Sequence, residues 1–354
     1  MERYNINILF RADSSMVIGT GHIMRCLTLA GKLNEKGAKV TFISREAEGD
    51  IIDIIERKGF GVYRLPKQTK VTWEEDVKQT LEIIKNEEGE IDWFVIDHYD
   101  IDIKWETEIR KYTKKIMVID DLANRKHDCD LLLDQNLSKN IETRYDELVP
   151  DECTKLLGPS YALLRDEFLE ARKNIRKRDG NVKRILVFFG GSDPTNETEK
   201  SLKALKMLNR NNITIDVVVG KSNANQEKIR EICSLMKNTN YYCQVDNMAF
   251  LMAKADLAIG AGGATTWERI YLGLPSITIV VADNQKELTE ILSEKKIVIN
   301  LGNSSSLTIN DIRDAFNSLI NQPGSLREMS RRAFNIVGES NILVKNITQM
   351  IFGG

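Results

Sequence analysis

The amino-acid sequence predicts an α/β protein with two domains, each built around a parallel β-sheet. Strand and helix patterns alternate from the N-terminus and resume after a strongly basic stretch at 165–184. The run 92–97 is almost continuously apolar, which is typical of a strand covered on both faces of a parallel sheet. At 354 residues the chain is also long enough for two domains.

The first series of elements places polar residues at the ends of its strands. Gly37 closes the first helix as a C-cap. Because open α/β sheets bind ligands at the carboxyl edge, these strand ends are candidate site positions. The expected strands are 6–10, 40–44, 62–65, 92–97, 116–119 and 131–133, with helices at 23–36, about 51–59 and about 74–86.

The second series begins after the basic stretch, which we expect to be a solvated helix and linker, because charge runs usually mark solvated faces. A return of the final segment to the first domain is one arrangement, which its sequence pattern alone does not establish. The expected strands are 184–189, 213–219, 241–245, 256–259 and 276–281, with helices at 309–320 and from 326. The expected division is 1–164, a linker at 165–182, a second domain at 183–336 and a C-terminal helix at 337–354.

Composition excludes several function classes. The net charge of −2 and pI near 6.1 give no general attraction to nucleic acid or to anionic membranes. The five cysteines are scattered without a CxxC pair, so neither a zinc site nor a disulfide framework is predicted. The first strand begins without a signal peptide, and no run of 18 apolar residues exists. We therefore expect a cytoplasmic protein without stable membrane association, as a monomer or a weak homodimer.

A polar loop links the first predicted strand to the first predicted helix and carries Arg11, Asp13, Gly19, Gly21 and His22. The two glycines allow the backbone to approach a ligand closely. The start of a helix favours a neutral imidazole, which can act as a base. The alternative is an ordinary capped helix with a solvated histidine.

Two glycine turns in the second half, 190–192 and 260–263, each follow a buried strand. Backbone N–H groups at such turns bind phosphate, although neither turn is a Walker A loop or a dinucleotide fingerprint. Glu268 lies in the following helix, where its carboxylate can reach a ribose diol. The alternatives are tight connections for the turns and an ion pair with Arg269, or with a surface residue, for Glu268.

Five stretches in order along the chain carry a resemblance to a known family. They are 11–26, 95–99, 161–168, 259–269 and 282–285. Together they resemble the PseG family of UDP-sugar hydrolases. The resemblance implies the GT-B architecture, in which two Rossmann-like domains face each other across a cleft, with a nucleotide-binding half similar to MurG-type glycosyltransferases.

The resemblance also implies the reaction. Water displaces UDP at C1 of UDP-2,4-diacetamido-2,4,6-trideoxy-β-L-altropyranose with inversion, without a metal ion or cofactor, in pseudaminic acid biosynthesis. His22 matches the histidine that handles the water, and Tyr99 and Asn284 match residues of the sugar site. The expected UDP-sugar contacts are Arg11, Gly19, Gly21, Gly191, Ser192, Gly262, Gly263, Thr265, Thr266, Glu268 and Gln285.

Three assignments have open alternatives. Asp13 either orients His22, contacts the sugar or caps its own loop, and His98 is either a site residue or structural. His127 lies in a polar loop and is expected to be solvated. The rival functions are a GT-B glycosyltransferase using a UDP-sugar donor, a hydrolase for an isomeric UDP-diacetamido sugar, and a silent nucleotide-sugar-binding protein.

Overall fold

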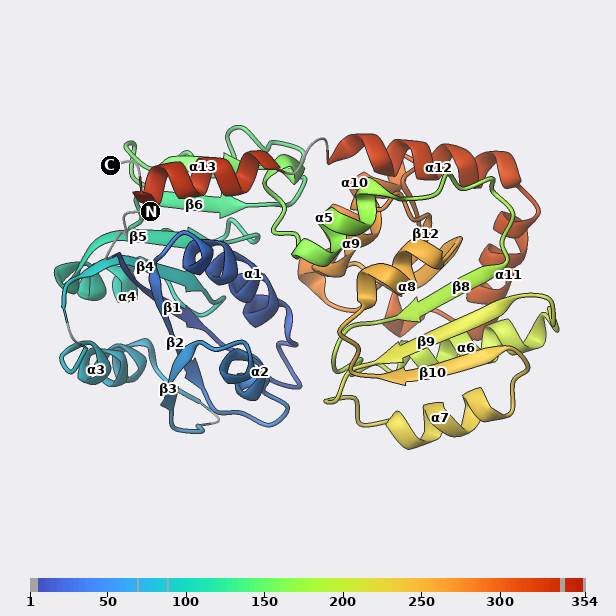
Figure 1. The fold of residues 1–354 in the computed structure, drawn as a ribbon, viewed down its shortest axis with the longest axis horizontal. Coiled ribbons are helices and arrows are strands. Elements are labelled where there is room, and N and C mark those ends of the chain that lie inside the picture. Colours follow the sequence, from blue (N-terminus) through green and yellow to red (C-terminus); the bar gives the residue numbers. More distant parts are fainter. Residues whose placement is uncertain (1–5, 69, 88, 338–340, 353–354) are drawn as a thin grey trace. The chain divides into compact units, whose positions relative to one another are not determined.

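The structure, a computed structural model, describes residues 6–68, 70–87, 89–337 and 341–352. The chain divides into two compact units (Figure 1). The first unit runs to Leu163 and includes the C-terminal segment from Glu339, and the second runs from Leu164 to Gly338. Each unit holds one parallel sheet, as the alternating pattern predicts.

The first unit is built on a seven-stranded parallel sheet with the order β3-β2-β1-β4-β5-β6-β7. The order reverses between β1 and β4, which is the switch point where such sheets bind ligands. Sequence periodicity misses β7, because its four residues are only partly buried. The strands are β1 (Asn7–Ala12), β2 (Lys39–Arg45), β3 (Gly61–Leu65), β4 (Ile91–Asp97), β5 (Thr113–Ile119), β6 (Leu131–Asp134) and β7 (Thr154–Leu157).

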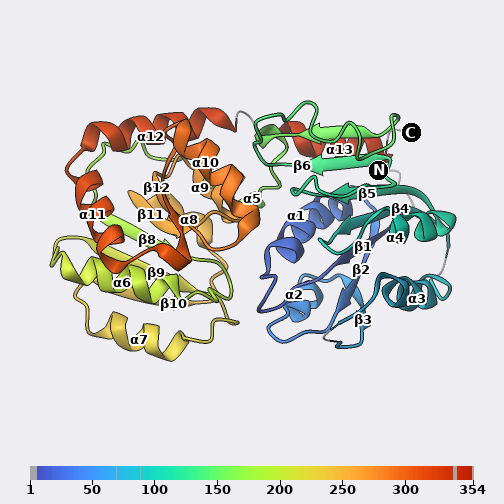
Figure 2. The same cartoon turned by 180° about the vertical axis from the view of Figure 1, so that it is seen from behind.

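Helices cover both faces of this sheet (Figures 1 and 2). Ile8 and Phe10 of β1 join the core under α1, α2 and α13, whereas Leu9 joins the core under α3 and α4. Ile347 and Ile351 of α13 belong to the first of these cores, so the chain's last helix packs on the first unit. The helices are α1 (Gly21–Glu35), α2 (Ile52–Arg57), α3 (Trp73–Ile84), α4 (Ile103–Ile109), α13 (Asn341–Phe352) and the 3₁₀ turns η1 (Arg110–Tyr112) and η2 (Pro159–Tyr161).

The second unit is built on a six-stranded parallel sheet with the order β10-β9-β8-β11-β12-β13. Its switch point lies between β8 and β11, whose carboxyl ends carry the two glycine turns. The strand β13 is the one that the sequence pattern missed. The strands are β8 (Arg184–Phe188), β9 (Thr214–Val219), β10 (Thr239–Cys243), β11 (Leu257–Ala261), β12 (Ser276–Val280) and β13 (Val298–Asn303).

The helices α6, α7, α11 and α12 share one core with alternate strand residues of this sheet. The helix α5 packs against α8 and α9. The bounds are α5 (Asp166–Lys173), α6 (Glu197–Met207), α7 (Gln226–Ser234), α8 (Met248–Lys254), α9 (Thr265–Tyr271), α10 (Lys286–Glu294), α11 (Ile309–Ile320) and α12 (Pro323–Ile336), with 3₁₀ turns η3 (Asp283–Gln285) and η4 (Ser304–Ser306).

The basic stretch contains the expected helix, α5, and exposed basic residues such as Lys173 and Lys177, but it is not solvated throughout as its charge predicts. Arg178 is buried and donates to the carbonyls of Met252 and Ala255 at the end of α8 and of Leu272 and Gly273 at the end of α9. Carbonyls at helix C-termini lack partners within the helix and carry partial negative charge, so a guanidinium satisfies them well.

Two neighbouring arginines act in the same way. Arg172 donates to the carbonyls of Tyr271 and Phe334 and stacks on both rings. Arg176 donates to the carbonyl of Lys254 at the end of α8. These arginines therefore fix the ends of the helices α8, α9 and α12 within the second unit.

Two further observations bear on the predictions from composition. All five cysteines are free thiols, and only Cys243 is exposed. In the described part of the chain, no helix has the length and apolar character that crossing a membrane requires.

Candidate active site

His22 and Asp97 form the central pair at the switch point of the first sheet. His22 is the second residue of α1, and Asp97 is the last residue of β4. The His22 Nδ1 lies 2.6 Å from Asp97 Oδ1, and since a carboxylate only accepts, Nδ1 carries the proton. The other nitrogen, Nε2, has no hydrogen-bond partner among the described residues. This tautomer leaves Nε2 as a base.

Asp97 is fully buried and uses both of its oxygens. Arg25 donates from Nε at 2.5 Å and from Nη2 at 2.7 Å, and the Cys26 thiol lies 3.6 Å away. Burial raises the pKa of Asp97, but Arg25 and His22 outweigh it and hold the pKa far below its usual value. Asp97 is therefore an ionised carboxylate that orients His22.

Tyr99 forms one wall beside His22. The two ring centroids lie 4.5 Å apart at 83°, an edge-on contact. The Tyr99 hydroxyl donates to Asp121 at 2.9 Å, and Arg25 bonds the same carboxylate. Burial and Asp121 raise the pKa of Tyr99 well above its ordinary value, so the phenol stays neutral. Asn284, the other predicted sugar contact, lies on η3 of the second unit.

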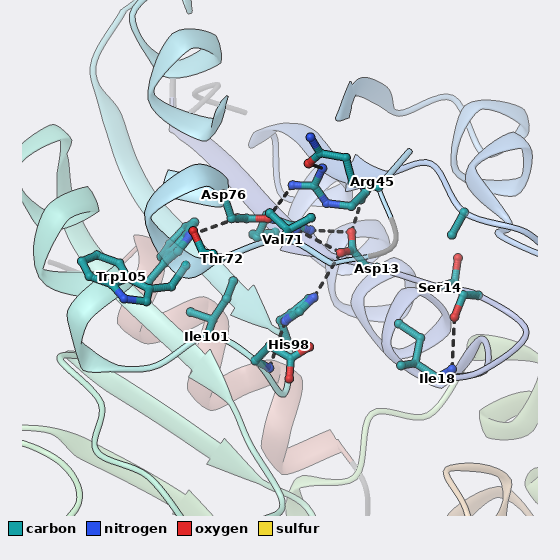
Figure 3. Close-up of a pocket in the computed structure, with 16 residues that line it drawn as sticks. Asp13, Ser14, Ile18, Arg45, Val71, Thr72, Asp76, His98, Ile101 and Trp105 are labelled. Carbon is teal, nitrogen blue, oxygen red and sulfur yellow. Dashed lines mark hydrogen bonds and ion pairs between the residues drawn. The ribbon is translucent and has the colours of Figure 1, made fainter. Parts of the chain in front are cut away.

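A second cluster lies on the other side of β1 and lines a cavity of about 200 Å³ (Figure 3). Arg11 is fully buried and donates to both carboxylate oxygens of Asp13 and of Asp76. Arg45 bonds Asp76 as well, with 2.8 Å between Nη2 and Oδ2. The charges of these two arginines and two aspartates cancel, and Asp100 adds one further acidic side chain to the lining.

His98 joins this cluster through Asp13. Its Nε2 lies 3.1 Å from Asp13 Oδ2, and its Nδ1 accepts the backbone N–H of Asp100 at 3.1 Å. An accepting Nδ1 places the proton on Nε2, so both nitrogens are engaged. The rest of the cavity wall combines polar side chains, such as Gln68 and Thr72, with the apolar side chains of Ile18, Val71, Trp73, Ile101 and Trp105.

A shared proton lies behind the site, at the ends of β5 and β6. The Tyr145 hydroxyl is 3.0 Å from Asp120 Oδ2 and 3.0 Å from Asp134 Oδ2. One hydroxyl proton cannot satisfy both carboxylates, so the second contact requires a proton on one of them. Burial raises the pKa of Asp134 to about 7, which assigns the proton to Asp134.

In the second unit, the two glycine turns have different surroundings. The loop after Gly190 and Gly191 ends at α6, where Asp193 accepts the backbone N–H groups of Glu197 and Thr198 at 2.9 Å. This helix start therefore already holds a carboxylate of its own chain. Gly191 packs backbone to backbone against Gly220, where a side chain would not fit.

The turn at Gly260–Gly263 leads directly into α9. Gln285 Oε1 accepts the N–H groups of Gly262 and Val281 at 3.2 Å, so this side chain ties η3 to the turn. A side chain on Gly262 would collide with Thr289, which explains the glycine there. Gln285 is thus a support of the turn as well as a predicted ligand contact.

Glu268, the fourth residue of α9, is paired with Arg165 and not with Arg269. Arg165 donates to Glu268 Oε1 from Nε at 2.9 Å and from Nη2 at 2.8 Å, and also bonds Glu167. Glu268 Oε2 has no partner among the described residues, and burial raises the pKa of this carboxyl. A hydroxyl donor at Glu268 would relieve this unfavourable burial.

Comparison with known proteins now identifies the family. The chain is 31% identical over 291 residues to a UDP-2,4-diacetamido-2,4,6-trideoxy-beta-L-altropyranose hydrolase of Campylobacter jejuni, covering 82% of this chain and 97% of that protein. The chain belongs to this hydrolase family, the PseG family. Residues 185–342 also match the glycosyltransferase family 28 C-terminal domain.

A second sequence relative and a solved structure are also similar to this PseG-family chain. It is 28% identical over 80% of its length to an uncharacterized protein of Methanocaldococcus jannaschii and spans 57% of that longer protein. The crystal structure of Acinetobacter baumannii MurG covers 99% of the chain with a TM-score of 0.65 at 14% identity. The fold is therefore GT-B, as predicted.

The structure of this PseG-family chain differs from the sequence-based predictions for two residues, Asp13 and His127. Asp97, not Asp13, orients His22, and Asp13 instead pairs with Arg11 and His98. His127 is buried, not solvated, because its Nδ1 pairs with the buried Glu106 at 2.7 Å. The signal for Asp97 was present, since it ends a buried strand one residue before His98, but its partner lies 75 residues away in sequence.

Proposed function

We propose that this protein hydrolyses UDP-2,4-diacetamido-2,4,6-trideoxy-β-L-altropyranose and releases UDP and the free sugar. The Asp97–His22 pair carries the proposal, because it presents an unengaged imidazole nitrogen at the switch point of the first sheet. Membership of the PseG family supports the choice of substrate.

In this proposal, His22 Nε2 removes a proton from a water molecule as the water oxygen attacks C1. The bond between C1 and the diphosphate oxygen breaks, and UDP leaves as an anion. Asp97 stabilises the imidazolium that forms and keeps Nδ1 protonated. A base that activates water on the face opposite the leaving group gives inversion, and general base catalysis contributes on the order of 10²–10⁴-fold.

The second unit binds UDP in this proposal. The turn at Gly260–Gly263 with Thr265 receives the diphosphate, because backbone N–H groups and a hydroxyl bind anions. Glu268 accepts hydrogen bonds from the ribose hydroxyls. Arg165 holds its Oε1, and its Oε2 lacks a donor among the described residues. The start of α6 is a weaker phosphate site, because Asp193 already occupies it.

The pocket of the first unit that is lined by Arg11 and Asp13 takes an uncharged arm of the sugar in this proposal. Its two arginines are paired with carboxylates and Asp100 adds a further acidic side chain, so the pocket does not favour a phosphate. Its apolar wall, with Val71 and Ile101, fits a methyl or an acetamido methyl group.

The test is to incubate the purified protein with a panel of UDP-diacetamido sugars and to follow UDP release. NMR of the first product formed reads its anomeric configuration, and inversion at C1 is expected. A glycosyltransferase is the second candidate, favoured by the family 28 domain match. Absence of UDP release from every panel member without an added acceptor would favour the transferase.

A further inference from the structure

Arg269 is a buried cation that forms no salt bridge with the described residues. The residue is 2% exposed. Its Nε has no hydrogen-bond partner in that same part of the chain. The other deeply buried arginines of the sites, Arg11 and Arg25, each contact two carboxylates.

The guanidinium of Arg269 lies directly under the glycine turn. Nη2 donates to the Ala261 carbonyl at 2.7 Å and to Thr266 Oγ1 at 3.1 Å, and Nη1 donates to Thr265 Oγ1 at 3.4 Å. A Cβ on Gly260 would lie 2.5 Å from the Phe188 carbonyl oxygen and 2.8 Å from Arg269 Nη1, so glycine lets both the neighbouring strand and the guanidinium approach here.

Arg178 shows how the fold otherwise accommodates a buried arginine. Its guanidinium donates to four carbonyls at the C-termini of two helices, where partial negative charge collects. Arg269 has one carbonyl and two hydroxyl oxygens as acceptors. The neighbouring Glu268 attracts Arg269 electrostatically but forms no salt bridge with it, since its Oε1 is bonded to Arg165.

A buried and unpaired charge is costly, so its retention needs a compensating anion. We propose that Arg269 is a positioning residue whose charge is compensated by the diphosphate of the bound nucleotide. It acts from beneath the turn at Gly260–Thr266 rather than by touching the ligand. This inference rests on the proposed function, since it assumes that the second unit binds UDP.

The hydrogen bonds of Arg269 also orient a donor. Thr265 Oγ1 accepts from Arg269, and its own proton has no acceptor among the described residues. Thr265 is half-buried, so this hydroxyl is available to a phosphate oxygen. Thr266, by contrast, is buried and donates its proton to the Ala261 carbonyl. Arg269 therefore orients the Thr265 hydroxyl so that it can donate to a phosphate oxygen. The guanidinium also provides a positive charge next to this hydroxyl.

The test measures binding of UDP and of uridine by calorimetry to the full chain and to Arg269→Met and Arg269→Lys. Removing the charge should weaken UDP binding about tenfold or more, as expected for a charge-assisted interaction. Uridine, which lacks the diphosphate, should bind all three proteins equally. Arg269→Lys should retain most of the UDP affinity. The control is Arg331→Met, which removes an exposed charge from the same unit and should change neither affinity.

Equal losses for UDP and uridine, or no loss for either, would overturn the role of Arg269. A second variant, Thr265→Val, serves if Arg269→Met does not fold, and it should weaken UDP but not uridine. An unchanged UDP affinity in Thr265→Val would equally count against the inference. Failure of the unmodified protein to bind UDP would instead refute the proposed function itself.

Discussion

The imidazole of His22 and the carboxylate of Asp97 meet at 2.6 Å although 75 residues separate them in sequence. The helix α1 delivers one and the strand β4 the other, and the pairing of β1 with β4 brings both to one edge of the sheet. The parallel sheet thus assembles a candidate base from two distant segments.

Replacing His22 by Ala should lower kcat by roughly 10²–10⁴-fold, because the base is lost. Asp97→Asn should also lower kcat, since an amide can donate to Nδ1 and so move the proton to Nε2. UDP affinity, measured by calorimetry, should stay the same in both variants. His98→Gln compares the two histidines, although His98 also lines the proposed sugar pocket. A larger loss of kcat there than in His22→Ala would reassign the base.

Glu268→Ala should weaken UDP binding by about 1.5–3 kcal/mol, the range for a hydrogen bond to a charged group. The loss should be much smaller for 2′,3′-dideoxy-UDP, because that nucleotide lacks the hydroxyls that Glu268 is proposed to bind. Titration of both nucleotides against both proteins provides the measurement. An equal loss for the two nucleotides would place Glu268 away from the ribose.

Asp134 should make the protein less stable as pH rises toward neutral. Its folded pKa of about 7 exceeds the ordinary value of 3.8, so the folded state holds a proton that the unfolded state releases. This preference favours folding at low pH and is lost as pH rises from about 4 to 7. The effect between pH 5 and pH 8 is roughly 2–3 kcal/mol.

The measurement is urea unfolding at pH 5 and pH 8 for the unmodified protein and for Asp134→Asn. The amide does not titrate, so the variant should show a smaller drop in unfolding free energy between the two pH values. Identical drops in both proteins would mean that Asp134 is ionised throughout.

Filling the first unit's pocket, which is lined by Arg11, Asp13 and Val71, should impair binding of the sugar but not of UDP. Val71 lines the cavity, and Val71→Trp should raise the KM for the UDP-sugar roughly tenfold or more by excluding the sugar's arm. UDP affinity should not change, because the variant lies in the other unit. A KM equal to that of the unmodified protein would show that the cavity stays outside the sugar site.

Much of the fold follows from local sequence patterns. Strands with continuous apolar runs, such as β4, and the glycine after α1 are recognisable from neighbours alone. The strands β7 and β13 are not, because their residues are mixed and only partly buried. An edge position alone does not hide a strand, because the edge strands β3 and β10 were predicted.

The candidate site was predicted as a set of residues but not as a set of contacts. His22 and Tyr99 lie together as the family resemblance implies, whereas the pairing of Asp97 with His22 depends on strand order. The basic stretch misleads for a related reason. Its charge run predicts exposure to solvent. In the structure, however, Arg172 and Arg178 donate to backbone carbonyls at the ends of helices that lie some 75 to 160 residues away in sequence.

The four contacts of Asp97 have a consequence for the catalytic cycle. With His22, the two Arg25 donors and the Cys26 thiol around it, Asp97 has no capacity left to take up a proton. The proton from the attacking water must therefore stay on His22 and leave through Nε2, the atom that received it. The proposed enzyme can reset only once that nitrogen is again open to solvent, which makes departure of the sugar a condition for the next turnover.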